Sequence, residues 1–349
     1  MTHGFNVILA IIALGVLIIV HEWGHYMAAK LCKMRVDRFS IGFGPALYRR
    51  VSGETTFQVG AIPLGGYVQI AGLSPDDESI SPNDPRSYIN RPAWQRFVAI
   101  AAGPVVNYVF AVLVFFLINW WAGVPGTQVY KLVPGQPAQV GGLAVGDLFV
   151  RINGVAVNTP TEVRSHIGKS AGQPLTVQVR RSGELTSVVI TPVRHSSGAY
   201  MVGIHMGESD QRERMGLIHA AKVAAIEPWH LTVNQLKGLA LFLSGGFKPK
   251  LDDFESIIGI TGRIANQMGA GLITGLEYVG KISALLGFFN LLPIPALDGG
   301  RLVFLGFEVF TRRRVNHRVE QIVHLIGLVI LLGLMLLLAG NDIIKLFRR

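Results

Sequence analysis

A charge-free apolar run leads directly into a short polar motif near the start of the chain. Residues 5–20 read FNVILAIIALGVLIIV, and HEWGH follows at 21–25. A helix needs about 20 mostly apolar residues to cross the hydrocarbon core of a bilayer. The run therefore predicts a membrane span with two histidines and a glutamate at one end. A cleaved signal peptide is the alternative, but no Lys or Arg precedes the run, and HEWGH is unlike a cleavage site.

Three further segments have the length and hydropathy of membrane spans, at roughly 97–121, 272–292 and 322–339. Only 15% of the residues are charged, whereas a soluble domain usually carries about 25%. The net charge of +10 could suit a nucleic-acid binder, but basic residues also flank membrane spans on the cytoplasmic side. Cys32 is the single cysteine, which excludes an intrachain disulfide framework. We expect a polytopic α-helical membrane protein with four transmembrane helices.

Basic loops predict the orientation of these spans. The loop after the first span begins with six Lys or Arg residues between positions 30 and 50, and the loop after the third span carries five arginines between 301 and 318. Positively charged loops stay in the cytoplasm. We therefore expect both termini, and the segment between the second and third spans, on the outer side.

The connecting segments differ in pattern. In the first cytoplasmic loop, FSIGFGPALYRR and ETTFQVGAIPLGGYVQIAG predict two hairpin-like strand pairs, and a flexible stretch follows at 74–87. The outer segment predicts short strands at DLFVRING and LTVQVRR, and a helix capped by Thr159 or Thr161. The expected order is 1–32 first span, 33–92 cytoplasmic β loop and flexible segment, 93–122 second span, 123–205 outer α+β domain, 206–271 amphipathic helical segment, 272–300 third span, 301–320 cytoplasmic basic loop, and 321–349 fourth span with the C-terminal tail.

The HEWGH motif predicts a metal site. His21 and His25 are four residues apart, so both imidazoles reach one ion from one face of a helix. Glu22 can act as general base on a metal-bound water. Ionisable residues inside an apolar span are costly and usually functional. Buried polar residues that stabilise the helix bundle, or a purely structural metal, are the alternatives.

A catalytic zinc usually has three protein ligands and one water. Asp298 is the strongest candidate for the third ligand, since Pro293 and Pro295 should end the third span just before it and bring it to the depth of the histidine pair. Taken alone, an aspartate in D-G-G is more often a turn residue. His324 lies in the fourth span without an acidic neighbour, and we expect a structural role for it.

HEWGHYMAAK at 21–30, AAGPVVN at 101–107 and NLLPIPALDGGRL at 290–302 together resemble the site-2 protease family of intramembrane zinc metalloproteases, with bacterial members like the regulator of sigma-E protease most similar. The resemblance implies Zn²⁺ held by His21, His25 and Asp298, with Glu22 as catalytic base. It also implies substrate-binding roles for Asn290, Pro293, Pro295, Gly65 and Gly66, the two glycines in a membrane-associated β loop that pairs with an unwound substrate strand.

The outer domain resembles a PDZ module of the circularly permuted bacterial type, through PGQPAQVGGLAVGDLFVRINGVAV at 134–157. Such a module binds a peptide C-terminus at a sheet edge. Gly203 and Ile204 are candidates for the loop that binds the terminal carboxylate, and an ordinary strand end is the alternative. The sigma-E protease has two PDZ modules, whereas this chain has room for one. Ser256-Ile257 also stands where relatives often have Gly-Pro.

The resemblance implies an endopeptidase of the bacterial inner membrane with a periplasmic PDZ domain. Its partners are the lipid bilayer and single-span membrane proteins, cut within or near their transmembrane segments after a first external cut, as in stress responses through anti-sigma factors or in removal of remnant signal peptides. No nucleic acid is expected. We also expect the PDZ module and the adjoining helices to exclude substrates with bulky outer domains. A membrane-anchored binding module with a vestigial zinc site and a metal transporter are the other hypotheses.

Overall fold

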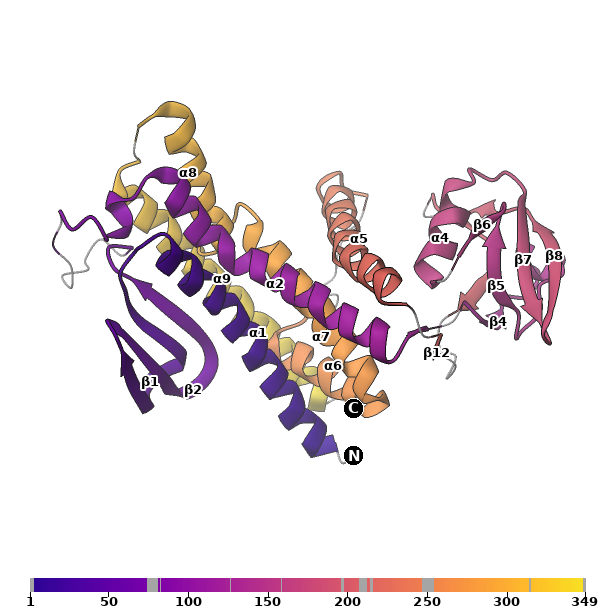
Figure 1. Ribbon diagram of the computed structural model, residues 1–349, viewed down its shortest axis with the longest axis horizontal. Helices are drawn as coiled ribbons and strands as arrows, with labels where there is room; N and C mark the ends of the chain where they lie inside the picture. Colours follow the sequence, from indigo (N-terminus) through magenta and orange to yellow (C-terminus); the bar gives the residue numbers. More distant parts are fainter. Residues whose placement is uncertain are drawn as a thin grey trace. The chain divides into compact units, whose positions relative to one another are not determined.

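The structure, a computed structural model, describes residues 3–73, 81, 83–125, 127–157, 159–195, 198–206, 212–213, 216–246, 254–313 and 315–347. The chain forms two compact units, one made of residues 1–116 with 224–349 and the other of residues 117–223. The helices of the first unit, two of which extend into the second, are α1 (His3–Leu31), α2 (Ala93–Trp121), α5 (Leu217–Leu243), α6 (Ile257–Ala270), α7 (Leu272–Leu291), α8 (Asp298–Thr311) and α9 (His317–Phe347), with the short η1 (Tyr88–Asn90) (Figure 1).

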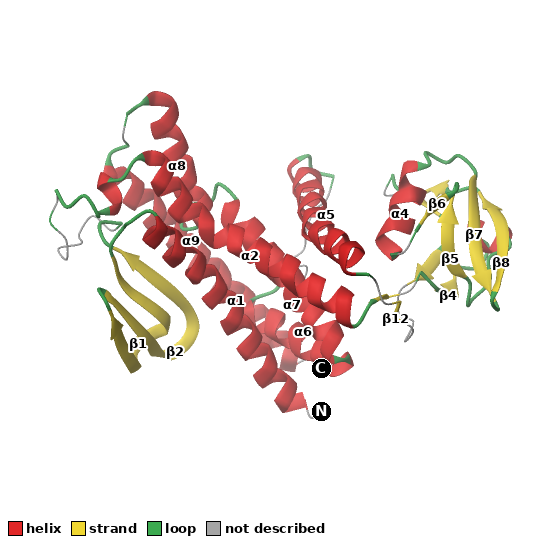
Figure 2. Cartoon of the chain, viewed as in Figure 1, coloured by secondary structure: helices red, strands yellow, loops and turns green. Residues whose placement is uncertain are grey.

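Four of the described helices, α1, α2, α7 and α9, are long and apolar enough to cross a membrane. This confirms the predicted class, a multi-pass α-helical membrane protein, and Figure 2 shows how strongly helix dominates this unit. The apolar run and the HEWGH motif belong to the single helix α1. The motif is therefore part of the same helix as the apolar run, with no break between them.

The helices of this unit pack closely around α1. Ala10 and Leu17 of α1 are buried with Ile264 of α6 and Val279 of α7 in one apolar cluster. Seven residues after Leu17 on the same side of α1, Gly24 lets α2 approach so closely that a Cβ atom there would lie 2.5 Å from the Ala102 carbonyl oxygen. Such close packing holds α1 against both α2 and α7.

The segment that follows α1 forms one long curved hairpin, β1 (Val36–Ser52) and β2 (Thr55–Ile70). Residues 38–41 of β1 pair both with residues 56–59 and with residues 66–69 of β2. The expected two strand pairs are thus one hairpin that folds back on itself, because the turn-forming glycines Gly42 and Gly44 bend β1 at positive φ. Most of the predicted flexible stretch 74–87 lies outside the described residues.

The second unit is an α+β domain with a core of its own, built around the buried side chains of Phe149, Ile152, Val177 and Val179. A sheet in the order β6-β5-β7-β8 forms its centre. Its main elements are β4 (Val129–Leu132), α3 (Pro137–Val140), β5 (Leu148–Ile152), β6 (Val155–Ala156), α4 (Pro160–Lys169), β7 (Leu175–Arg181), β8 (Glu184–Ile190) and β11 (Ile204–Met206), with the short strands β3 (Val124–Pro125), β9 (Val193–Arg194), β10 (Tyr200–Met201) and β12 (Arg212–Glu213). Of the two candidate caps of α4, Thr159 is the one used, and it forms a reciprocal capping box with Glu162.

The segment 301–320 was expected to be a basic loop, but most of it is helix α8, which runs from Asp298 to Thr311. The sequence LVFLGFEVF has helical apolar spacing and buries Leu305. Arginine at both ends of this stretch made it look like a surface loop. Asp298 is consequently the first residue of a helix and belongs to a rigid element.

Candidate metal centre

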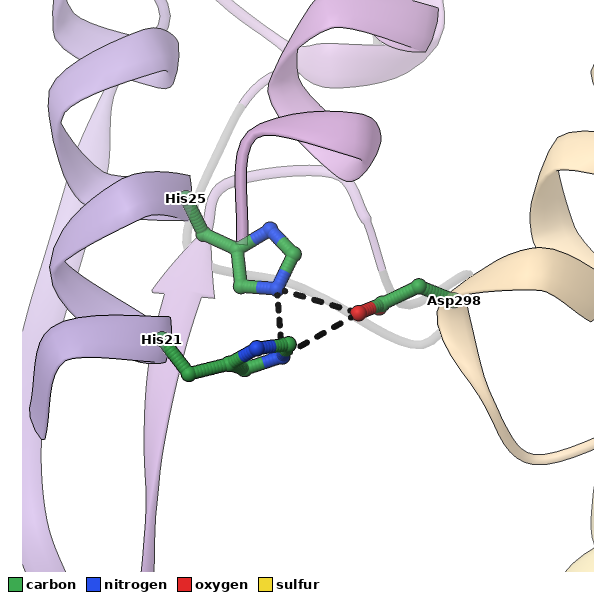
Figure 3. A group of neighbouring side chains, drawn as sticks. All are labelled: His21, His25 and Asp298. Carbon is green, nitrogen blue, oxygen red and sulfur yellow. Dashed lines mark hydrogen bonds and ion pairs between the residues drawn. The ribbon is translucent and has the colours of Figure 1, made fainter. Parts of the chain in front are cut away.

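Three potential metal ligands from two helices lie together (Figure 3). His21 and His25 project from successive turns of α1, and Asp298 faces them from the first turn of α8. The His21 Nε2 and His25 Nε2 atoms are 3.2 Å apart. Asp298 Oδ2 is 3.1 Å from His21 Nε2 and 3.4 Å from His25 Nε2.

These separations fit a tetrahedral zinc ion. Ligand atoms bound at zinc's usual distances, ~2.0–2.1 Å, lie about 3.3 Å from one another. Asp298 Oδ2 is buried and has no hydrogen-bond partner among the described residues, although buried carboxylate oxygens are normally paired. Two imidazoles and one carboxylate are also a ligand set that zinc accepts in catalytic sites. The donor set therefore fits the metal that the sequence predicts.

Hydrogen bonds from α2 orient both imidazoles. His25 Nδ1 lies 2.9 Å from the Ala99 carbonyl oxygen, so Nδ1 carries the proton and donates it. The Nε2 atom of His25 is then free to bind a metal. Nδ1 of His21 lies 3.1 Å from the side-chain amide of Asn107. The Oδ1 atom of Asn107 has no partner among the described residues, so exchanging the two amide atoms lets His21 Nδ1 donate to Oδ1 in the same way.

Glycine at position 103 makes room for the His25 ring. A Cβ atom there would lie 2.3 Å from His25 Nε2. Gly103 and Asn107 both belong to the AAGPVVN segment at 101–107. This segment is one of the three motifs behind the family resemblance, but the sequence alone predicted no function for either residue. The sequence signal that could have found Asn107 is a polar residue in the middle of an apolar span, since polar groups at membrane depth are usually functional. In the structure its side chain is fully buried.

Glu22 faces a cavity of about 360 Å³ beside the three ligands. The cavity is lined from α1, α2, β2 with the turn after it, and the stretch from the end of α7 into α8, by His21, Glu22, His25, Tyr67, Val68, Ile70, Leu73, Ile100, Asn290, Ala296, Leu297, Asp298 and Arg301. The Val68 amide is a hydrogen-bond partner of the Glu22 carboxylate. Glu22, the three grouped side chains and residues of β2 thus line one space.

Only some of the residues expected to bind substrate lie at or near this cavity. Asn290 lines the cavity, and its amide donates to the Leu286 carbonyl oxygen over 2.9 Å. Gly66 lies against Glu22, since a Cβ atom there would come within 3.3 Å of Glu22 Cγ. Gly65 packs instead on Phe43, Pro293 is exposed, and Pro295 packs on α9 at Gly327. The structure thus places Asn290 in the cavity wall and Gly66 against Glu22, whereas the other three line no part of this cavity.

A buried ion pair holds α8 to α2. The Arg96 guanidinium donates to Glu308 Oε1, and the two side chains are only 8% and 17% exposed. Breaking one partner of such a pair leaves an uncompensated buried charge, which is strongly destabilising. The pair therefore fixes the helix that begins with Asp298.

In the second unit, Gly203 and Ile204 lie where β11 begins. Ile204 pairs with Leu132 of β4, and the Gly203 carbonyl oxygen accepts from the Val133 amide over 2.9 Å. Gly203 has φ +77°, and a Cβ atom there would collide with Gln136 at the start of α3. The two residues thus form a tight loop at a strand end, and their role in binding a terminal carboxylate stays a prediction.

Known proteins are similar to this chain over nearly its whole length. The model of peptidase family M50 matches residues 9–334. A Clostridium acetobutylicum protein is 33% identical over 342 residues, covering 97% of this chain and 98% of its own length. Metalloprotease MmpA of Caulobacter vibrioides is 32% identical, covering 97% and 96%, and zinc metalloprotease RasP of Geobacillus kaustophilus is 29% identical, covering 98% of both chains.

Among solved structures, PDZ domains of SdrC-like proteins from Listeria monocytogenes and Listeria innocua are similar to about a quarter of the chain. They have 21% and 20% identity, both with a TM-score of 0.22, and the match covers 87% and 99% of those domains. The family match spans both of the separated ligand motifs, HEWGH and the aspartate that opens α8. The chain belongs to peptidase family M50 and is a zinc metalloprotease of the site-2 protease type.

Proposed function

We propose that this protein is an intramembrane endopeptidase of the bacterial inner membrane, which hydrolyses peptide bonds within or near the transmembrane segments of single-span membrane proteins. The observation that supports the proposal is that His21, His25 and Asp298 lie together beside Glu22. The histidines and Glu22 belong to α1, and Asp298 lies between α7 and α9 in the sequence; all three of these helices are long enough to cross a bilayer. His21, His25 and Asp298 would hold Zn²⁺, which when bound polarises the scissile carbonyl and lowers the pKa of a water.

The chain's own residues supply the remaining chemistry. Glu22 takes a proton from the attacking water and returns it to the leaving amine. Asn107 and the Ala99 carbonyl keep the two imidazoles in the orientation that the ligand atoms need. The cavity of about 360 Å³ admits a short stretch of extended backbone rather than a whole helix. A helical substrate must therefore unwind locally before it is cut.

The edge of β2 next to the cavity is suited to hold the unwound stretch. Tyr67, Val68 and Ile70 line the cavity from this strand. An extended peptide that adds to a strand edge gains main-chain hydrogen bonds without needing a particular sequence. Asn290, which lines the same cavity, can accept a hydrogen bond from a substrate amide. Substrates with helix-breaking residues near the cut are favoured, because they unwind at lower cost.

The outer domain is proposed to act as a PDZ-type module in the periplasm, where Gly203 and Ile204 would bind a peptide C-terminus. Both chain termini lie on the same side, as the basic cytoplasmic loops predict. The natural substrates are proposed to be anti-sigma factors or remnant signal peptides, already shortened by a first external cut. An untrimmed substrate that is cleaved as fast as a trimmed one would contradict this order of events.

The direct test compares membrane proteomes of cells carrying the wild-type chain or Glu22→Gln. Single-span fragments should accumulate in the variant, because the base is lost while the metal ligands remain. Glu184→Gln, at an exposed site on the second unit, is the matched control and should leave the proteome unchanged. If Glu22→Gln also leaves it unchanged, the chain acts through its binding domain, and the protease proposal fails. A metal transporter would instead show zinc flux in vesicles.

A further inference from the structure

The connection between α7 and α8 holds one non-glycine residue in a left-handed conformation. Ala296, two positions before Asp298, has φ +74°. A side chain is strained in this region, and the strain persists only where neighbouring groups impose the conformation. The Ala296 amide donates to Nδ1 of His324 on α9 over 3.0 Å. The strained residue is thus tied directly to the last membrane helix.

The same face of α9 contacts the preceding residue. Gly327 lies one turn after His324, and a Cβ atom on it would be 2.4 Å from Pro295 Cβ. Residues three apart share a helix face. The α9 backbone therefore packs directly on Pro295, while His324 holds Ala296. The α7–α8 connection also packs closely on α8. A Cβ atom on Gly300 of α8 would lie 2.6 Å from the Ile294 carbonyl oxygen.

The hydrogen bond also fixes the state of the His324 ring. An Nδ1 atom that accepts a hydrogen bond carries no proton, so the neutral ring has its proton on Nε2. Nε2 is buried and has no partner among the described residues. Phe304 of α8 packs against the ring at a centroid distance of 5.8 Å. A buried donor left unsatisfied is costly, so packing of an ordinary core residue does not account for histidine here.

We propose that His324 is a positioning residue for the metal centre: it holds Ala296 in the left-handed conformation and so places the Asp298 carboxylate against His21 and His25. His324 lines no part of the cavity described above and does not belong to the group of three potential ligands. The inference rests on the proposed zinc site. It adds that a residue of the fourth span, on α9, helps to position one of the metal ligands. Removing groups that orient metal ligands typically lowers metal affinity 10–100-fold.

The test measures zinc affinity of the purified full-length chain in detergent by competition with a chelator, together with the absorption spectrum of the Co²⁺-substituted protein. His324→Phe should lower zinc affinity about 10–100-fold and alter the Co²⁺ spectrum. His324→Asn, whose side-chain oxygen can replace Nδ1 as acceptor, should remain near wild type. Leu325→Phe, on the exposed face of α9, is the control and should change neither reading.

A rescue separates positioning from general destabilisation. Adding Ala296→Gly to His324→Phe should restore zinc affinity to within a few-fold of wild type, because glycine adopts a positive φ without help. A general packing defect at position 324 would gain nothing from this change. Failure of the rescue, or wild-type affinity in folded His324→Phe, would overturn the proposal.

A second pair of variants covers the case in which His324→Phe does not fold. Gly327→Ala leaves His324 intact but pushes on Pro295, and should also weaken zinc binding. Gly333→Ala, on the same helix with nothing within 4 Å, should not. Equal affinities in these two variants would contradict the role of α9. If the wild-type chain itself binds no zinc, the proposed function fails before the question of His324 arises.

Discussion

Replacing Gly103 by alanine adds a single methyl group at the most sensitive contact in the metal centre. The new Cβ atom would lie 2.3 Å from His25 Nε2, whereas an ordinary contact begins at 3.4 Å. The imidazole must therefore retreat by about 1.1 Å, the difference between the two distances, or the two helices must part by as much. Zinc sites tolerate deviations of only about 0.2 Å in ligand distance. His25 should consequently leave the ligand set.

The expected loss follows from this displacement. Changes in residues that merely orient a ligand cost about 10–100-fold in metal affinity, so a change that displaces a ligand should cost at least about 100-fold. Stability should change much less. Overpacking a core typically costs ~1–3 kcal/mol, while alanine in a helix interior regains ~0.5–1 kcal/mol relative to glycine. The variant should therefore fold and fail to hold zinc.

The assay is zinc affinity of the purified chain by chelator competition, with thermal unfolding measured on the same sample. Gly15→Ala is the matched control, because it makes the same change on α1 where nothing lies within 4 Å. It should keep wild-type affinity and gain slightly in stability. A folded Gly103→Ala protein that binds zinc within threefold of wild type would refute the assignment of His25 Nε2 as a ligand atom.

Three further predictions concern other parts of the chain. Asn107→Leu should lower zinc affinity about 10–100-fold, measured by the same competition, because His21 loses the group that orients it; unchanged affinity would exclude that role. Burial raises the pKa of Asp147, but hydrogen bonds from Arg181 and the Ala144 amide outweigh it, so the folded pKa is lowered. This carboxylate contributes stability above its unfolded pKa of about 3.9, and the contribution is lost as the pH falls through the folded value. Thermal unfolding of a 117–223 fragment should show Asp147→Asn destabilised by about 2 kcal/mol at pH 7 and by less below pH 3; an equal loss at both pH values would contradict the ion pair. Thr159→Ala should cost about 1 kcal/mol at every pH through loss of the α4 cap, and a pH-dependent loss in that variant would point to a titrating partner.

Sequence reasoning reached the parts of the site that depend on local spacing. His21 and His25 share a helix face through their four-residue separation alone, so no tertiary information was needed to pair them. Asp298 was reached by matching membrane depth along two separate spans, with the family resemblance in support. The curvature of the β1–β2 hairpin was missed, because it follows from pairing between residues that a linear pattern cannot relate.

The groups that orient the ligands could not be derived in the same way. Asn107 and Gly103 act across the α1–α2 contact, and which atoms meet there depends on how closely the two helices pack. His324 was expected to be structural, but its acceptor role toward Ala296 requires a backbone conformation that no sequence pattern reveals. Helix α8 was mistaken for a loop because its flanking arginines outweighed its apolar spacing.

The most direct test of the central claim is cleavage of a single-span model substrate by the purified chain, with products identified by mass spectrometry. The wild-type chain with one zinc should cut within or near the membrane segment. Glu22→Gln should retain its zinc and release no product, because His21, His25 and Asp298 are unchanged while the base is gone. Cleavage by Glu22→Gln at the wild-type rate, or cuts only at sites far from the membrane segment, would contradict the account.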